Sequence, residues 1–129
     1  MRMKTDQTYA IDVDAEATYL PAQSLPHQDR YVFSYTITLR NSGTVSAQLK
    51  SRHWIITNAN GDIEEVHGEG VVGKQPHLKP GESFTYTSGA VLTTPVAAMQ
   101  GYYDMIASDG KPFRAPIAPF TLAIPGCLH

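Results

Sequence analysis

The segment at residues 68–76, with the sequence GEGVVGKQP, carries the pattern in this chain that is most suggestive of chemistry. It contains a G-x-G-x-x-G motif and nearly matches the phosphate-binding motif G-x-x-x-x-G-K-[ST]. Both motifs hold phosphate where a glycine-rich turn opens a helix, because free N–H groups and the helix dipole attract the anion. The residues that would form such a site are Gly68, Gly70, Gly73 and Lys74.

The residues that follow this segment argue against both nucleotide-binding motifs. Pro76 and Pro80 disfavour a helix here, because proline has no backbone N–H and restricts the residue before it. Gln75 stands where the motif needs a Ser or Thr hydroxyl to bind magnesium. We therefore predict a connection between two strands, with glycines in conformations that other residues avoid. The alternative is an anion nest of backbone N–H groups that binds phosphate, pyrophosphate or a nucleotide.

Glu65, His67 and Glu69 form a second candidate site, for a divalent cation. On a regular strand these three side chains share one face, and carboxylates and imidazoles are common metal ligands. Their spacing is not a recognised zinc signature, so histidines that face solvent or make one hydrogen bond are the simpler interpretation. Cys127 and His129 form a further candidate pair of ligands near the C-terminus. We predict no cofactor.

The sequence lacks the arrangements that are typical of enzymes. It has no G-x-S-x-G nucleophile elbow. Its single cysteine, Cys127, has no base predicted beside it, so it would be a poor nucleophile. The adjacent Glu64 and Glu65 would face opposite sides of a strand and could not work as a paired acid and base. We therefore predict a protein without enzymatic activity.

Alternating runs of β-forming residues must position these candidates. At residues 31–39 every second side chain is apolar, which predicts a strand with one face buried. Further strands are predicted at 48–57, 62–67, 83–90, 100–107 and 118–122, with an edge strand at 8–13 and the proline-rich stretch 112–125 as a last edge strand. The run around Trp54 does not alternate cleanly, which indicates either burial on both faces or a β-bulge. The turn signals are Asn58-Ala59-Asn60-Gly61, Pro80-Gly81 and Asp109-Gly110. About seven or eight short strands at this spacing predict an all-β, two-sheet antiparallel sandwich of the immunoglobulin or fibronectin type III kind.

Length and composition set the class of protein. We predict that the 129 residues form a single domain, with its core within about residues 7–123 and a tail at 124–129. A net charge of −2 disfavours nucleic acid as the main partner. The single cysteine allows no intramolecular disulfide, which favours a reducing compartment. The chain has no run of 18 apolar residues to span a membrane and no apolar secretory signal at its start. We therefore expect a cytoplasmic protein.

Seven segments within residues 9–122 carry a resemblance to a known family. They are WIIT at 54–57, GEGVVGKQP at 68–76, KPGE at 79–82, FTYTSG at 84–89, LTTP at 92–95, MQGYYDM at 99–105 and FTL at 120–122. In these segments the chain resembles the ApaG family of small bacterial proteins. Three residues depart from the usual family pattern: Asn58 for Asp, Lys74 for Glu and Ala97 for Gly. The first change removes a candidate cation ligand, and the second makes the phosphate-motif lysine look incidental.

The resemblance implies a fibronectin type III-like fold and no established enzymatic activity. It also implies a genetic link to cobalt and magnesium resistance and to the operon for diadenosine tetraphosphate hydrolysis, while related eukaryotic domains suggest protein binding. Our first hypothesis is a module that recognises a protein partner through one sheet face or through the loops at one end. The alternatives are a phosphate or nucleotide sensor at residues 68–73, with Lys74 supplying charge, and a regulatory protein that binds divalent cations.

Overall fold

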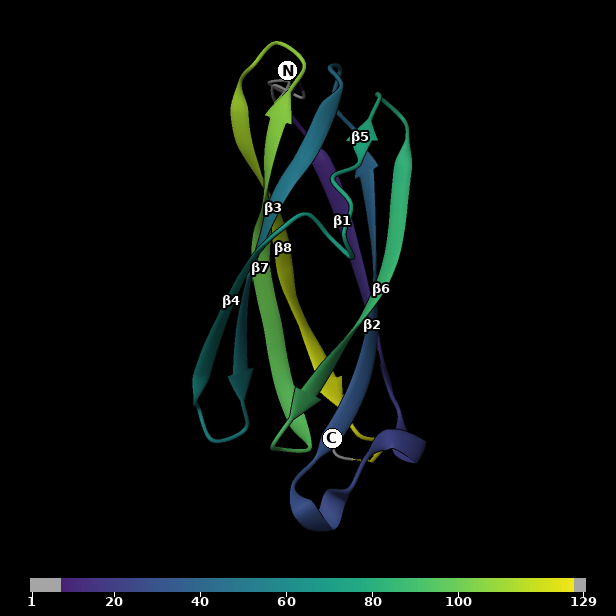
Figure 1. Cartoon of the computed structure of the whole chain (residues 1–129), viewed down its shortest axis with the longest axis vertical. Helices are drawn as coiled ribbons and strands as arrows, with labels where there is room; N and C mark the ends of the chain where they lie inside the picture. Colours follow the sequence, from purple (N-terminus) through teal and green to yellow (C-terminus); the bar gives the residue numbers. More distant parts are fainter. Residues whose placement is uncertain (1–7, 127–129) are drawn as a thin grey trace, which may run out of the picture.

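Two antiparallel β-sheets pack face to face in the computed structural model, which describes residues 8–126 (Figure 1). One sheet has the strand order β1-β2-β6, and the other has the order β4-β3-β7-β8 with the short β5 paired to β3. The strands are β1 (Ile11–Tyr19), β2 (Tyr31–Asn41), β3 (Ala47–Asn58), β4 (Ile63–Glu69), β5 (His77–Leu78), β6 (Ser83–Leu92), β7 (Val96–Ala107) and β8 (Pro112–Ala123). The predicted two-sheet antiparallel sandwich and its number of strands are confirmed.

Tight turns and two short helices connect the strands. The predicted turns are confirmed, with positive φ angles at Gly61, Gly81 and Gly110. The predicted edge strand at 8–13 is wrong in its bounds, because the alternation continues through small alanines to the end of β1. Two short 3-10 helices, η1 (Pro21–Gln23) and η2 (Pro26–Gln28), link β1 to β2, each with proline at its start. Within residues 8–126 no helix is long and apolar enough to cross a membrane.

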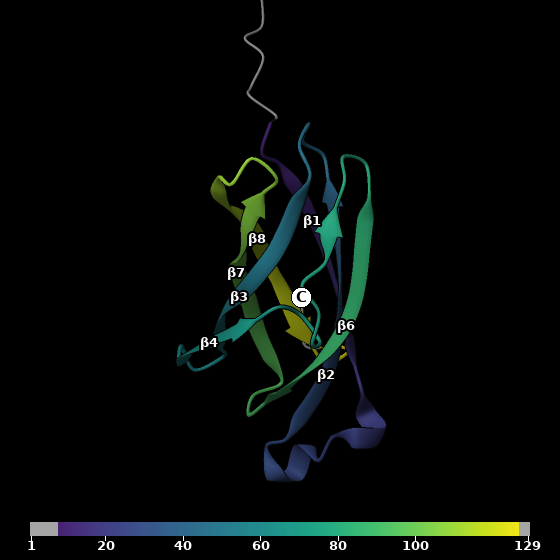
Figure 2. The same cartoon turned by 45° about the horizontal axis from the view of Figure 1, so that its top comes forward.

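The two sheets do not meet in the same way along their two sides. On one side β1 contacts β8, so the outer strands of the two sheets lie together. On the other side the outer strands are β4 and β6, and the segment between β4 and β5 crosses from one towards the other (Figure 2). Val71 in that segment is fully buried in the core. The sandwich is therefore closed by strands on one side and by a connecting segment on the other.

A β-bulge in β3 decides which of its side chains face the interior. Ala47 and Leu49 are buried before the bulge, and the pairing with β7 shifts between Leu49 and Ser51. Beyond the shift the alternation is reversed, so that Trp54 is buried in the core while Ser51 bonds Asp104 at 2.9 Å on the outer face. Both alternatives for the irregular run around Trp54 are therefore found: β3 contains a bulge, and both of its faces are covered there, because His53 on the outer face and Trp54 on the inner face are buried.

Aromatic side chains hold the two sheets together at the centre. The Trp54 ring meets the ring of Tyr35 edge-on, with centroids 5.5 Å apart, and packs against Tyr103 and Phe120 at 6.3 and 5.9 Å. The hydroxyls of Tyr86 in β6 and Tyr103 in β7 lie 2.5 Å apart, which joins one sheet to the other through a buried hydrogen bond. A buried hydroxyl needs such a partner, so the pair lets two large aromatic rings fill the core without a lost hydrogen bond.

Asn41 is a fully buried polar residue at the crossover from the first sheet to the second. Its amide Nδ2 donates to the carbonyl oxygens of Val45 and Leu78, both at 2.9 Å, and its Oδ1 accepts from the N–H of Gly43 at 2.9 Å. These three bonds satisfy the side chain and tie the crossover to β5.

Gly101 of β7 lies opposite Trp54 of β3, at the point where the pairing of β7 with β8 shifts register. A Cβ atom on Gly101 would lie 1.9 Å from the carbonyl oxygen of His53. We predict that Gly101→Ala lowers the free energy of unfolding by about 3 kcal/mol or more, because backbone must move to make room. Chemical denaturation measures this. The matched control is Gly89→Ala, whose added Cβ would make an ordinary 3.5 Å contact with Phe33. A Gly101→Ala protein as stable as that control would contradict the prediction.

The buried tyrosine pair predicts a loss of stability in alkali. Burial raises the pKa of Tyr86 from 10.0 to about 12, and it raises the pKa of Tyr103 well above its usual range. Above pH 10 the unfolded chain therefore releases protons that the folded chain retains, so the free energy of unfolding falls by about 1.4 kcal/mol per pH unit for each tyrosine. Denaturant titrations at a series of pH values between 10 and about 12 measure this slope. In the variant with Tyr86→Phe and Tyr103→Phe the free energy of unfolding should fall less steeply with pH. An equal slope in both proteins would contradict the role of these two tyrosines in the loss of stability.

Candidate functional site

The glycine-rich segment forms a turn between strands, as predicted, and no helix follows it. Gly68 and Glu69 end β4, and the chain then reverses at Val72 and Gly73, which both have positive φ angles of 43° and 77°. The N–H of Val71 donates to the carbonyl of Lys74 at 2.8 Å, and the reverse bond is 2.9 Å long. This is the geometry of a two-residue hairpin turn. The Lys74 side chain is exposed.

Each glycine of the motif has its own structural reason. Gly70 has a φ of 61°, and a Cβ there would lie 2.4 Å from the carbonyl oxygen of Lys74. Gly73 needs only its positive φ, because the space around it is open. The N–H groups of Gly70, Val71 and Lys74 donate to backbone carbonyls, so these three donors serve the fold and not an anion nest.

Gly68 makes room for a side chain that the sequence motif does not contain. A Cβ on Gly68 would lie 2.5 Å from Cζ of Arg52, which is its partner across the β3–β4 pair. Nη1 of Arg52 donates to the carbonyl oxygens of Glu69 and Gly70, at 3.0 and 2.9 Å. The first glycine of the motif, Gly68, therefore makes space for the side chain of Arg52, which points between the sheets. Sequence reasoning missed Arg52. The predicted bulge was the available signal, because a bulge before Arg52 turns both Arg52 and Trp54 towards the interior.

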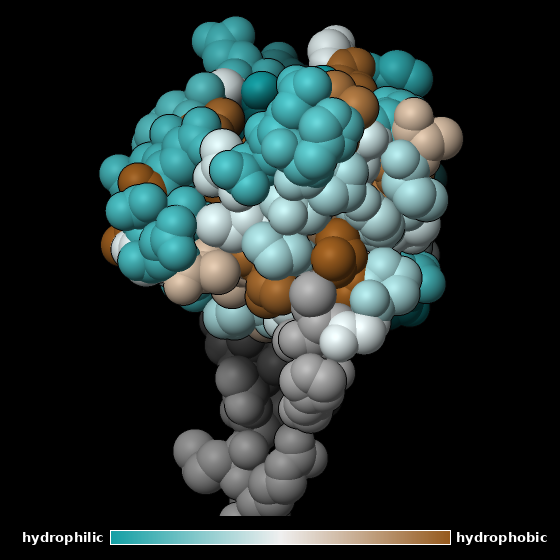
Figure 3. All heavy atoms as spheres, turned by 90° about the horizontal axis from the view of Figure 1, so that it is seen from below, coloured by the Kyte–Doolittle hydropathy of each residue, from teal (hydrophilic) through white to brown (hydrophobic). Residues whose placement is uncertain are grey.

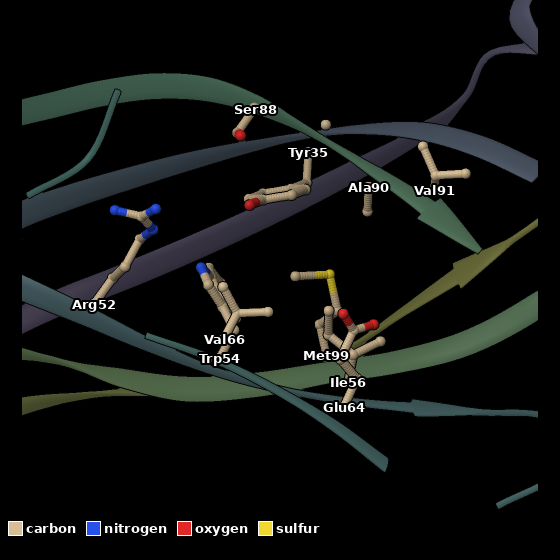
Figure 4. Close-up of a pocket in the computed structure, with 11 residues that line it drawn as sticks. Tyr35, Arg52, Trp54, Ile56, Glu64, Val66, Ser88, Ala90, Val91 and Met99 are labelled. Atoms are coloured by element: carbon tan, nitrogen blue, oxygen red, sulfur yellow. The ribbon is translucent and has the colours of Figure 1, made fainter. Parts of the chain in front are cut away.

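Arg52 lies at one end of a cavity of about 280 Å³ between the two sheets (Figure 4). The cavity lies between the outer strands β4 and β6, where the main-chain groups on one side of each strand have no sheet partner. A smaller neighbouring cavity of about 180 Å³ shares Ile56, Glu64 and Val91 with it and extends to Ile63. We call the two together the inter-sheet groove. Its first cavity is lined by Tyr35, Arg52, Trp54, Ile56, Glu64, Val66, Ser88, Gly89, Ala90, Val91 and Met99.

The two ends of this cavity differ in chemistry. At one end lie the hydrogen-bond donors, namely the guanidinium of Arg52, the hydroxyls of Tyr35 and Ser88, and the indole nitrogen of Trp54 (Figure 4). At the other end lie Met99, Ile56 and Val91, with the carboxylate of Glu64 beside them. Among residues 8–126, Nε1 of Trp54 is the buried side-chain nitrogen or oxygen that has no hydrogen-bond partner. A buried donor without a partner lowers the free energy of unfolding by about 1 to 3 kcal/mol.

The residues of the predicted cation site lie on the outer face of the second sheet. Glu65 and His67 share the outward face of β4, as predicted, and both contact His53. Nε2 of His67 contacts Nδ1 of His53, and Oε1 of Glu65 lies 3.5 Å from Nε2 of His53. The His53 ring also stacks on Tyr102, with centroids 4.8 Å apart. Within the described part of the chain, no three His, Cys, Asp or Glu side chains are grouped so that they could hold a metal ion. Cys127 and His129 lie outside the described residues.

Comparison with known proteins identifies the family. Residues 21–107 match the family model described as the ApaG domain. The chain belongs to the ApaG family. It is 58% identical to protein ApaG of Pseudomonas entomophila (strain L48), over 97% of this chain and 99% of that protein. It is 59% identical to protein ApaG of Azoarcus sp. (strain BH72), over 98% of this chain and 100% of that protein.

The ApaG fold is also seen in a similar crystal structure. A Bordetella pertussis protein described as ApaA superposes with a TM-score of 0.91 at 48% identity, over 95% of this chain and 99% of that one. These names state no ligand or reaction.

The glycine segment predicts a ranking of variants. Gly70→Ala should lower the free energy of unfolding by about 2 to 3 kcal/mol, because it combines a positive φ with a backbone clash. Gly73→Ala should cost only about 1 kcal/mol, since its added methyl group meets open space. Lys74→Ala should stay within about 0.5 kcal/mol of the wild type. Chemical denaturation of the three proteins gives the order. Glycine variants that are fully stable but lose pyrophosphate binding would instead make this segment a ligand site.

Proposed function

We propose that this ApaG protein is a non-enzymatic binding module that takes an extended segment of a partner protein into the inter-sheet groove. The observation that carries the proposal is the combination of two outer strands with exposed apolar side chains at one opening. Val91 in β6 is 54% exposed and Ile63 in β4 is 67% exposed, and both line the groove. Large apolar side chains exposed beside a groove are typical of binding sites. The reducing, cytoplasmic location favoured by the single cysteine suits such a role.

The strand edges favour a peptide as the ligand. β4 and β6 each end their sheet, so each offers main-chain N–H and C=O groups on its free side. An extended segment binds such an edge through its own main chain and gains specificity from alternate side chains that enter pockets. The groove is divided into two cavities of about 280 and 180 Å³, each below the lower limit of ordinary small-molecule sites, which favours separate side chains of one segment over a whole nucleotide.

The outer face of the second sheet and the end of the sandwich lack the two free strand edges that border the groove. On the outer face of the second sheet, Arg114 covers the ring of Tyr102 at 4.0 Å and pairs with Asp104 at 3.2 Å, so polar groups cover this part of the face. The end of the sandwich that carries η1 and η2 is mostly hydrophilic, with separate hydrophobic spots (Figure 3). Of the two surfaces in the first hypothesis, a sheet face or the loops at one end, neither combines exposed apolar side chains with two free strand edges as the groove does.

The groove side chains support binding and not catalysis. Its serine, Ser88, makes no hydrogen bond to a base within residues 8–126 and therefore lacks the activation that a catalytic serine needs. Our proposal also needs no cation. A role in cobalt or magnesium tolerance would, in this view, act through the bound partner.

The proposal predicts that a charge at the groove opening abolishes peptide binding. Peptides selected from a random display library against the wild-type protein should bind Val91→Arg at least about tenfold more weakly, because the long cation blocks the apolar end. Ile106→Arg is the matched control, since Ile106 is 37% exposed and does not line the groove. Isothermal titration with the selected peptides measures both variants. Peptides that bind Val91→Arg as tightly as the wild type, or a library that yields no binders, would overturn the proposal.

A further inference from the structure

The donor end of the inter-sheet groove contains a buried N–H that has no partner within residues 8–126. Trp54 is only 2% exposed, and its indole N–H is buried without a partner in the described chain. Figure 4 shows its nitrogen directed towards the space beside Tyr35, with Arg52 and Ser88 around the same end. An N–H, a guanidinium and two hydroxyls that face one small space match a ligand that accepts hydrogen bonds.

The charge at this end is fixed in place. Nη1 of Arg52 is held by the carbonyls of Glu69 and Gly70, and its guanidinium occupies the space that Gly68 leaves by having no side chain. The side chain is therefore oriented before any ligand arrives, which reduces the entropy lost on binding. Arginine has a planar fork of donors that matches a carboxylate, and hydrogen bonds between charged groups are about twice as strong as neutral ones.

The other end of the groove limits the ligand to one negative charge. Glu64 lies beside the apolar side chains of Met99, Ile56 and Val91, so a second carboxylate there would meet a like charge. An aliphatic group suits this end instead. In an extended chain, residues i and i+2 point to the same side and lie about 6.5 to 7 Å apart.

We infer that the inter-sheet groove recognises an acidic segment, in which an Asp or Glu carboxylate binds Trp54 Nε1 and Arg52 while an aliphatic residue two positions away fills the apolar end. This inference rests on the proposed function and adds the chemistry of the partner to it. The partner is therefore a protein with an extended, acidic and aliphatic motif.

The single tryptophan provides a direct test. The probes are two capped peptides, acetyl-TETVT-amide and acetyl-TQTVT-amide, which differ only in the carboxylate. In a ¹H–¹⁵N correlation spectrum the indole N–H gives one side-chain signal, and the Glu peptide should shift it downfield and saturate. The Gln peptide should bind about tenfold more weakly or worse, because the charged hydrogen bonds are lost.

Three variants complete the test. Arg52→Gln should remove the preference for the Glu peptide over the Gln peptide. Glu64→Gln should strengthen binding of the Glu peptide, since the like charge is removed. Arg40→Gln is the control, because Arg40 is exposed and does not line the groove, and it should retain the preference. Melting curves establish that the variants fold.

The outcomes separate this inference from the proposed function. Equal affinities for the two peptides, or an indole signal that does not move as the Glu peptide is added, overturn carboxylate recognition. If display-selected peptides still depend on Val91 in that case, the binding module stands without its acidic specificity. If those peptides are indifferent to Val91→Arg, both the inference and the proposed function fail.

Discussion

The single extra residue in β3 is the constraint on which the inter-sheet groove depends. Before the bulge, Ala47 and Leu49 point inward, and after it Arg52 and Trp54 do so. A regular strand would place the last two on the outer face, where an arginine is ordinary and a tryptophan is exposed. The bulge thus moves one cation and one indole donor into the space between the sheets, and the neighbouring strands supply what surrounds them.

The glycine motif and Arg52 explain each other. A G-x-G-x-x-G pattern suggests a phosphate site when it is considered alone, because glycine is the residue that lets a ligand approach the backbone. Here the group that approaches is an arginine of the same chain, over Gly68 and against the carbonyl of Gly70. The requirement for glycine is the same in both cases, so only the cross-strand partner distinguishes them.

The sequence predicted those parts of the fold that depend on neighbouring residues. The alternation in β2 and the turn at Gly61 are local signals, and both are confirmed. The two-residue β5 has no local signal, because it exists only through its pairing with β3. The groove was beyond sequence reasoning for a similar reason: Arg52 meets Gly68 through strand register, and Val91 joins them from the other sheet.

The outer strands β1 and β8 contact each other on one side of the sandwich, while on the opposite side β4 and β6 are bridged only by the segment that carries the buried Val71. Among residues 8–126 the strand ladders run within each sheet, and none of them joins β4 to β6. Side chains such as the Tyr86–Tyr103 pair connect the two sheets. The width of the groove is therefore set by side-chain packing between the sheets and not by a hydrogen-bonded ladder.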